Sequence, residues 1–172
     1  DALYIADGHH RSASASRVAA ATEGAADDDN VNYFLAVAFP DDETMILDYN
    51  RVVKDLNGLS VKELLAKVGE SFLVEASNGP AKPSAPGEFG MYVDGRWYRL
   101  QIQADKVPTD DPVGRLDVSL LQDNLLHPLL GIGDPRTDNR IDFIGGIRGL
   151  EELERRVDNG DMAIAFALYP TE

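Results

Sequence analysis

The sequence predicts an α/β or α+β domain in which helices pack on a mixed sheet. Two local patterns carry this prediction. Residues 88–93 and 96–103 read as strands on either side of Asp94-Gly95, a dipeptide that strongly favours a two-residue hairpin. Ser60 and Glu63 have the spacing of a helix capping box, and apolar residues follow at helical spacing to residue 68. The chain should therefore contain both hairpins and amphipathic helices.

The segments before the capping box are predicted to be mostly strand. Residues 3–6 form a short apolar strand, and residues 10–21 form an alanine-rich helix, because alanine is a strong helix former. Glu23-Gly24 is expected to end that helix, since glycine accepts the left-handed conformation found there. Residues 31–39 and 44–49 should then pair as a hairpin, and residues 51–54 either extend it or begin a third strand.

The segments after the capping box alternate between strands and helices. Strands are expected at residues 72–75, 141–144 and 162–168, and helices at 116–130 and 150–157. Asp117 or Ser119 should cap the first of these helices, and Pro128 should kink or end it. Residues 76–87 contain three prolines and two glycines and read as a loop or linker. Gly145-Gly146 should let the backbone approach another group closely.

Composition excludes several classes of function. The chain has 172 residues, a formal net charge of −14 and no cysteine. Disulfides, thiolate metal sites and a cysteine nucleophile are therefore excluded, and a cytoplasmic location is expected. An acidic surface repels nucleic acid, and no apolar run reaches the ~20 residues that a membrane span needs. Any anion must be held by local donors, because the overall charge opposes its binding.

Apolar, strand-like runs lie close to both ends of the chain. We therefore expect residues 1–172 to form one domain that is the C-terminal part of a longer chain, with an internal linker at 76–87. The missing N-terminal part of the same protein is then an expected partner.

The candidate functional centre is the turn between the strand at 3–6 and the helix that follows. A helix start presents free N–H groups and a dipole that favour an anion, and Gly8 allows a tight turn. Arg11 can grip a phosphate with two hydrogen bonds. Further donors come from His9, His10 and Ser12, while Asp7 can orient a histidine or accept a substrate proton. The alternative is a surface turn without a ligand, because Asp-Gly turns are common before helices.

Other candidates follow from the same residue chemistry. Asp7, His9 and His10 are a candidate metal site, although adjacent histidines usually point in different directions. Two polar groups are secondary candidates for anion binding, with a solvated strand edge and an internal salt bridge as their respective alternatives. They comprise Arg51, Lys54 and Asn57 in the first group and Arg136, Asp138 and Arg140 in the second.

Several segments together resemble a bacterial and archaeal family known as domain of unknown function 1015. They are residues 3–11 (LYIADGHHR), 51–59 (RVVKDLNGL), 116–122 (LDVSLLQ) and 134–141 (DPRTDNRI). The similarity extends over nearly the whole chain. Family members are about twice as long, so the resemblance implies that this chain is the C-terminal part of one.

The Asp7–Arg11 element alone is also similar to the nucleotide-binding motif of the chromosome-partition-protein and sulfiredoxin superfamily, which includes free-serine kinases. This similarity implies that Gly8, His9, His10 and Arg11 hold the phosphates of a nucleoside di- or triphosphate, with Asp7 beside the reacting group or a magnesium ion. The expected function is phosphoryl transfer to a small molecule, with free serine as one acceptor. The alternatives are a non-catalytic nucleotide- or anion-binding regulatory module and a purely structural half-domain.

Overall fold

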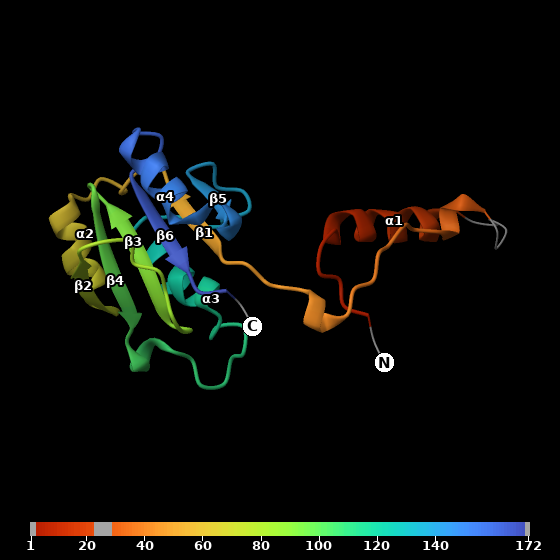
Figure 1. Ribbon diagram of the computed structural model, residues 1–172, viewed down its shortest axis with the longest axis horizontal. Helices are drawn as coiled ribbons and strands as arrows, with labels where there is room; N and C mark the ends of the chain where they lie inside the picture. Colours follow the sequence, from red (N-terminus) through yellow and green to blue (C-terminus); the bar gives the residue numbers. More distant parts are fainter. Residues whose placement is uncertain (1–2, 23–28, 171–172) are drawn as a thin grey trace. The chain divides into compact units, whose positions relative to one another are not determined.

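The computed structural model describes residues 3–22 and 29–170. They fall into two compact units, called here the first unit (residues 1–44) and the second unit (residues 45–172). Figure 1 labels the helices and strands of each unit.

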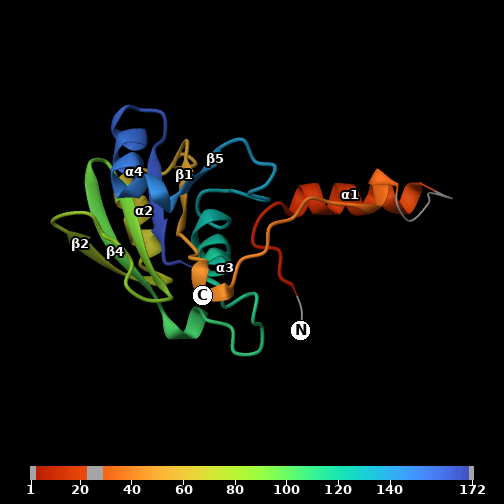
Figure 2. The same ribbon diagram turned by 45° about the vertical axis from the view of Figure 1, so that its right-hand side comes forward.

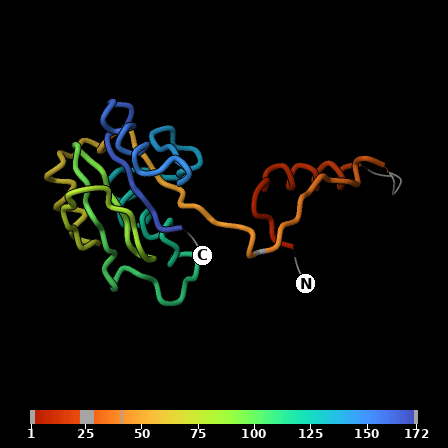
Figure 3. Tube along the Cα trace, in the orientation of Figure 1, coloured from red at the N-terminus to blue at the C-terminus, as the bar shows by residue number. Residues whose placement is uncertain are grey.

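The second unit is built on a six-stranded sheet in the order β2-β4-β3-β6-β1-β5. Its five strand pairings are all antiparallel, so the sheet does not mix strand directions and the fold is of the α+β kind. The predicted class, a sheet with helices packed on it, is confirmed. The strands are β1 (Tyr49–Val53), β2 (Phe72–Ser77), β3 (Glu88–Val93), β4 (Arg96–Ile102), β5 (Ile141–Gly145) and β6 (Ile164–Leu168). Figure 3 traces the path of the chain, coloured by residue number.

Helices cover both faces of this sheet, because neighbouring strand residues point to opposite sides. Val53 and Phe166 belong to a core that also contains the apolar residues of α2 (Val61–Val68), α3 (Asp117–Leu121) and the π-helical turn η4 (Gln122–Leu126). Val52 and Ala165 belong to a second core, which includes Leu153 of α4 (Gly149–Asp158). Figure 2 gives a second view of these helices around the sheet.

Local sequence signals account for several element boundaries. Ser60 caps α2, and Glu63 bonds back to the backbone of Ser60, so the capping box is confirmed. Asp94 and Gly95 both have positive φ, 51° and 71°, as a tight hairpin turn between β3 and β4 requires. The short 3₁₀ turns of this unit are η3 (Ala104–Lys106) and η5 (Gly146–Arg148).

The loop after β2 packs closely on the sheet. Residues 78–87 connect β2 to β3 within the sheet, and Ala81 is buried against β3. A Cβ atom at Gly90 would collide with the carbonyl oxygen of Ala81. Gly90 therefore permits this loop to lie against the strand.

The first unit consists of α1 (His9–Ala21) and the 3₁₀ turns η1 (Asn30–Asn32) and η2 (Asp41–Glu43). None of its described residues is buried. Leu3 and Tyr4 are 91% and 90% exposed, and the apolar residues around Phe34 and Phe39 are exposed as well. The described part of this unit thus has no apolar core of its own.

Three strand predictions are wrong. Residues 3–6 and 31–39 contain no strand, and residues 44–48 are not strand either, so the predicted hairpin is absent and β1 starts at Tyr49. These segments are apolar and rich in β-prone residues. A strand forms, however, only when a neighbouring strand pairs with its backbone N–H and C=O groups. Among the described residues, none of the strand pairings of the sheet includes these segments. The predicted helix end at Glu23-Gly24 lies outside the described residues.

The predicted helix at 116–130 is shorter than expected. Regular α-helix ends at Leu121, and η4 continues in π-helical form to Leu126, two residues before Pro128. Neither Asp117 nor Ser119 caps it, because Leu116 occupies the N-cap position. The Asp117 carboxylate instead accepts a hydrogen bond from the Gly87 N–H at 2.7 Å. Within residues 3–22 and 29–170, no helix is both long and apolar enough to cross a bilayer.

Candidate functional site

The Asp7–Arg11 turn forms the start of α1. Gly8 is the N-cap residue and has φ 85°, a left-handed conformation that glycine adopts without steric cost. The helix closes with the Ser12 N–H donating to the Gly8 carbonyl at 2.9 Å. The N–H groups of His9, His10 and Arg11 precede this bond and therefore have no acceptor within the helix. Gly8 has no side chain that could cap them.

The Arg11 side chain folds back over the turn. One guanidinium nitrogen would lie 3.4 Å from a Cβ atom at Gly8, and the same nitrogen lies 3.6 Å from a carboxylate oxygen of Asp7. The two side chains are 77% and 95% exposed, so solvent screens this ion pair and it is weak. An incoming anion can therefore replace the Asp7 carboxylate as the partner of Arg11.

All five residues of the turn line one open hollow of about 420 Å³. The predicted residues Asp7, His9, His10 and Arg11 are thus brought together, but they are neighbours in sequence and all are exposed. In the part of the chain that the structure describes, no three acidic or histidine side chains cluster as metal ligands. A magnesium ion here would take one carboxylate from Asp7 and its other oxygens from phosphate and water, a ligand set that Mg²⁺ accepts.

A second hollow, of about 520 Å³, lies in the second unit and is called here the Arg51 pocket. Strand register creates one wall: Arg51 of β1 pairs with Phe143 of β5, and Tyr49 lies two residues from Arg51 on the same face. The opposite wall comes from α3 and η4, and a third side from residues 134–136. Residues of β1 therefore meet three segments from the later part of the chain here.

Aromatic rings surround the Arg51 guanidinium. The rings of Tyr49 and Phe143 stack at 5.2 Å, and the guanidinium carbon lies 5.3 and 4.9 Å from their centroids. Arg51 donates a hydrogen bond to the Tyr49 carbonyl. Burial lowers the pKa of Arg51 to about 10, and the neighbouring Tyr49 acts in the opposite direction. Arg51 is therefore still a cation at neutral pH, but a partly desolvated one.

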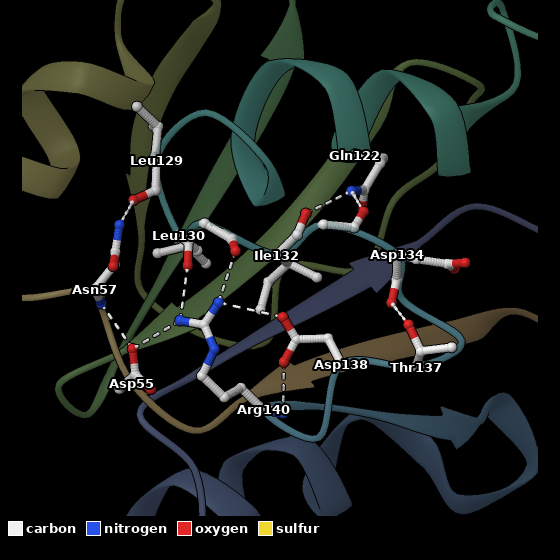
Figure 4. A network of polar contacts seen from close by, with 12 residues as sticks. Asp55, Asn57, Gln122, Leu129, Leu130, Ile132, Asp134, Thr137, Asp138 and Arg140 are labelled. Atoms are coloured by element: carbon white, nitrogen blue, oxygen red, sulfur yellow. Dashed lines mark hydrogen bonds and ion pairs between the residues drawn. The ribbon is translucent and has the colours of Figure 1, made fainter.

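Two of the other predicted candidates, Asp138 and Arg140, belong to a polar network that holds the loop at residues 129–134 (Figure 4). Arg140 donates to the carbonyls of Leu130 and Gly131 at 3.1 and 2.7 Å. It also pairs with Asp138 at 3.2 Å and with Asp55 at 3.4 Å. Hydrogen bonds from the backbone and side chain of Arg140 lower the pKa of Asp138. Arg140 and Asp138 thus make an internal salt bridge, which is the alternative to anion binding that the sequence left open for them.

The three remaining candidates are Asn57, Lys54 and Arg136. Asn57 donates to the Leu129 carbonyl at 3.1 Å and belongs to the same network (Figure 4). Lys54 is exposed just after β1. Arg136 binds Asp134 through two side-chain hydrogen bonds of 3.0 and 2.9 Å, which lower the pKa of Asp134, and both residues line the Arg51 pocket.

Sequence reasoning missed Tyr49, Phe143 and Gln122 as pocket residues. The spacing of Tyr49 and Arg51 could have indicated a shared strand face, since residues i and i+2 point the same way. Nothing local could have indicated Phe143, because its approach depends on the pairing of β1 with β5. Gly146 was predicted to approach another group, and that group is Asp48, whose carbonyl accepts the Gly146 N–H at 2.7 Å and whose carboxylate occupies the space of a Cβ.

Comparison with known families identifies this chain. The model of the family described as "Protein of unknown function (DUF1015)" matches residues 1–119, which include the whole Asp7–Arg11 turn and β1. The chain therefore belongs to this family. Searches of curated proteins and of solved structures found no match.

Proposed function

We propose that this member of the DUF1015 family binds the phosphates of a nucleotide at the Asp7–Arg11 turn and transfers a phosphoryl group to a small molecule. The observation that carries the proposal is the uncapped start of α1, with the Arg11 guanidinium folded over Gly8. Backbone N–H groups and a guanidinium together supply the donors that a phosphate accepts. In a chain of charge −14 these local donors would have to outweigh the overall field.

Each residue of the turn has a proposed role. The N–H groups of His9, His10 and Arg11 bind phosphate oxygens, with the Arg11 guanidinium and the Ser12 hydroxyl as further donors. One of the two imidazoles stabilises the phosphoryl group in transit, because its charge spreads over the outer oxygens during transfer. Magnesium would supply charge neutralisation, and Asp7 is the carboxylate that would hold it.

The acceptor is a small molecule with a hydroxyl group, and free serine is the acceptor suggested by the similarity to free-serine kinases. The bond between phosphorus and the leaving nucleotide oxygen breaks as the acceptor oxygen binds phosphorus. Where Asp7 does not hold the metal, its carboxylate can receive the proton of the acceptor hydroxyl. Release of Asp7 from Arg11 follows from phosphate binding, because both anions compete for the same guanidinium.

A second candidate function is nucleotide or anion binding without turnover. The exposure of the turn favours it: the Asp7 side chain is 95% exposed, whereas catalytic carboxylates are commonly desolvated. Such a module would report the presence of nucleotide to a partner rather than transfer its phosphate.

Calorimetric titration tests the shared part of both proposals. Magnesium-ATP, ADP and CTP are added to the full chain, to Arg11→Met and to Arg17→Met. Arg17 is a matched control, because it lies on the same helix and its side chain bonds to Ser14. Arg11→Met should weaken nucleotide binding by about tenfold or more, the expected cost of losing a charge-assisted hydrogen bond. Equal affinities for all three proteins would reject the phosphate-binding turn.

Turnover separates the two candidates. The full chain is incubated with the bound nucleotide and free serine, and phosphoserine is measured by mass spectrometry. Phosphoserine that disappears in Arg11→Met supports transfer to serine. Nucleotide binding without a phosphorylated product supports the non-catalytic module.

A further inference from the structure

The charge of Arg51 lacks a balancing carboxylate. Among the residues that the structure describes, no Asp or Glu oxygen lies within 4.0 Å of its guanidinium, although seven other arginines do form such pairs. Its one hydrogen bond to the Tyr49 carbonyl uses a single donor of the five that a guanidinium has. A partly buried cation with unused donors, placed at a hollow, is suited to receive an anion from outside the chain.

The carboxylates that line the pocket do not neutralise the charge of Arg51. Asp134 is bound by Arg136 through two hydrogen bonds, so its charge is already compensated. Asp123 lines the pocket but is exposed on η4. Neither one makes an ion pair with Arg51.

Two sides of the pocket, the one formed by η4 and the one formed by the loop that leads to Asp134, are fixed before any ligand arrives. Gln122 donates to the carbonyls of Ile132 and Gly133 at 2.8 and 3.0 Å, and Arg140 holds the carbonyls of Leu130 and Gly131 (Figure 4). These bonds immobilise the loop that carries Asp134 into the pocket. A preformed wall lowers the entropy cost of ligand binding.

Apart from Ser119, the remaining side chains that line the pocket are apolar or aromatic. Val118, Leu126, Pro135 and the ring of Phe143 face the same hollow as Arg51. Its volume of about 520 Å³ is typical of pockets that hold small organic ligands. A ligand that fits therefore combines an anionic group with an apolar body.

We propose that the Arg51 pocket binds a small organic oxyanion, whose carboxylate or phosphate pairs with Arg51 and whose apolar body packs on Phe143, Val118 and Leu126. This site shares no residue with the Asp7–Arg11 turn, and the proposal does not depend on the proposed function.

The experiment uses probes that separate charge from shape. Benzoate and phenyl phosphate carry an oxyanion on an apolar ring, benzyl alcohol carries the ring without charge, and acetate and inorganic phosphate carry the charge without a ring. Each is titrated into the full chain while the side-chain Nε–Hε signal of Arg51 is followed by NMR. We expect benzoate or phenyl phosphate to shift this signal saturably and to bind more tightly than the other three probes.

Two variants then test whether Arg51 is the cation that binds the oxyanion. Arg51→Met should weaken binding of the ring-bearing oxyanion by about tenfold, while Arg96→Met, which removes an exposed cation from β4, should leave it unchanged. Preference for benzoate identifies a carboxylate ligand, and preference for phenyl phosphate identifies a phosphate ligand.

Three results would overturn the proposal. The first is the absence of a saturable shift of the Arg51 signal. The second is that benzyl alcohol binds as tightly as benzoate or phenyl phosphate, and the third is that acetate and inorganic phosphate do so. If Arg51→Met does not fold, the NMR titration of the unaltered chain still decides. Arg11→Met should bind these probes normally, so failure here is distinguishable from failure of the nucleotide proposal.

Discussion

The two candidate sites differ in how the chain builds them. The hollow at Asp7–Arg11 is made by five consecutive residues, all within the first unit, which buries none of its described residues. The Arg51 pocket is made by four segments brought together by a sheet with a core on each face. A local site depends on backbone conformation alone, whereas an assembled site depends on the stability of the whole unit. Substitutions that destabilise the second unit should therefore impair the Arg51 pocket but leave the Asp7–Arg11 turn intact.

The same contrast appears at two helix starts. In α2, Ser60 and Glu63 satisfy the backbone from within, and these hydrogen bonds from Ser60 lower the pKa of Glu63. In α1, Gly8 offers no side chain, and the first turn contains no acidic residue. A helix that caps itself is stabilised, and a helix that leaves its donors free can bind a ligand.

The largest expected effect comes from the core of the second unit. Phe166 is fully buried on the central strand β6, so Phe166→Ala should lower the free energy of unfolding by about 3–5 kcal/mol. Val18→Ala in α1 should change it by less than about 0.5 kcal/mol, because Val18 is exposed and packs on no core. Urea unfolding followed by fluorescence of Trp97, the single tryptophan, measures both.

Comparable losses in the two variants would contradict the contrast between the units. They would mean that Val18 contributes to a core as Phe166 does. Phosphate binding by Val18→Ala should in turn be unchanged, since the Asp7–Arg11 turn does not depend on that side chain.

The features that could be predicted from the sequence are those that depend on residues adjacent in the chain. The capping box at Ser60, the turn at Asp94-Gly95 and α1 were all predicted from nearest neighbours, and each is confirmed. The unformed strands at 3–6 and 31–39 show the limit of that reasoning, because β structure requires a partner strand that the pattern itself does not supply.

The Arg51 pocket was only half predictable for the same reason. Arg51 and Arg136 were identified as cations of interest, but the pairing of Arg51 with Phe143 joins segments about ninety positions apart. Arg140 was identified as a candidate binding residue, yet the carbonyls of Leu130 and Gly131 occupy its donors. A charged residue type does not reveal whether its partner is a ligand or the chain itself.

A smaller effect should come from the loop that forms the pocket wall. Gly131 has φ 68°, and a Cβ atom there would also lie 3.3 Å from the Asn57 amide nitrogen. Gly131→Ala should therefore cost about 1–2 kcal/mol of unfolding free energy. Gly133→Ala is the matched control, because Gly133 has no positive φ and no atom within 4 Å of its Cβ position. Urea unfolding compares the two variants.

The pocket should respond to the same pair of substitutions. Gly131→Ala disturbs the contact with Asn57 and so loosens the wall, which should weaken binding of a ring-bearing oxyanion, while Gly133→Ala should not. Equal stability of the two variants would show that the loop is not held as the hydrogen bonds of Arg140 and Asn57 indicate.

The smallest expected effect compares the two helix starts directly. Ser60→Ala removes the cap of α2 and should lower the free energy of unfolding by about 1 kcal/mol. Ser12→Ala in α1 should leave it within about 0.5 kcal/mol, because Ser12 lies inside the helix and caps nothing. Nucleotide affinity should show the reverse order, with a loss in Ser12→Ala and none in Ser60→Ala. If Ser60→Ala weakened nucleotide binding and Ser12→Ala did not, the donors of α1 would not be the ones that hold the phosphate.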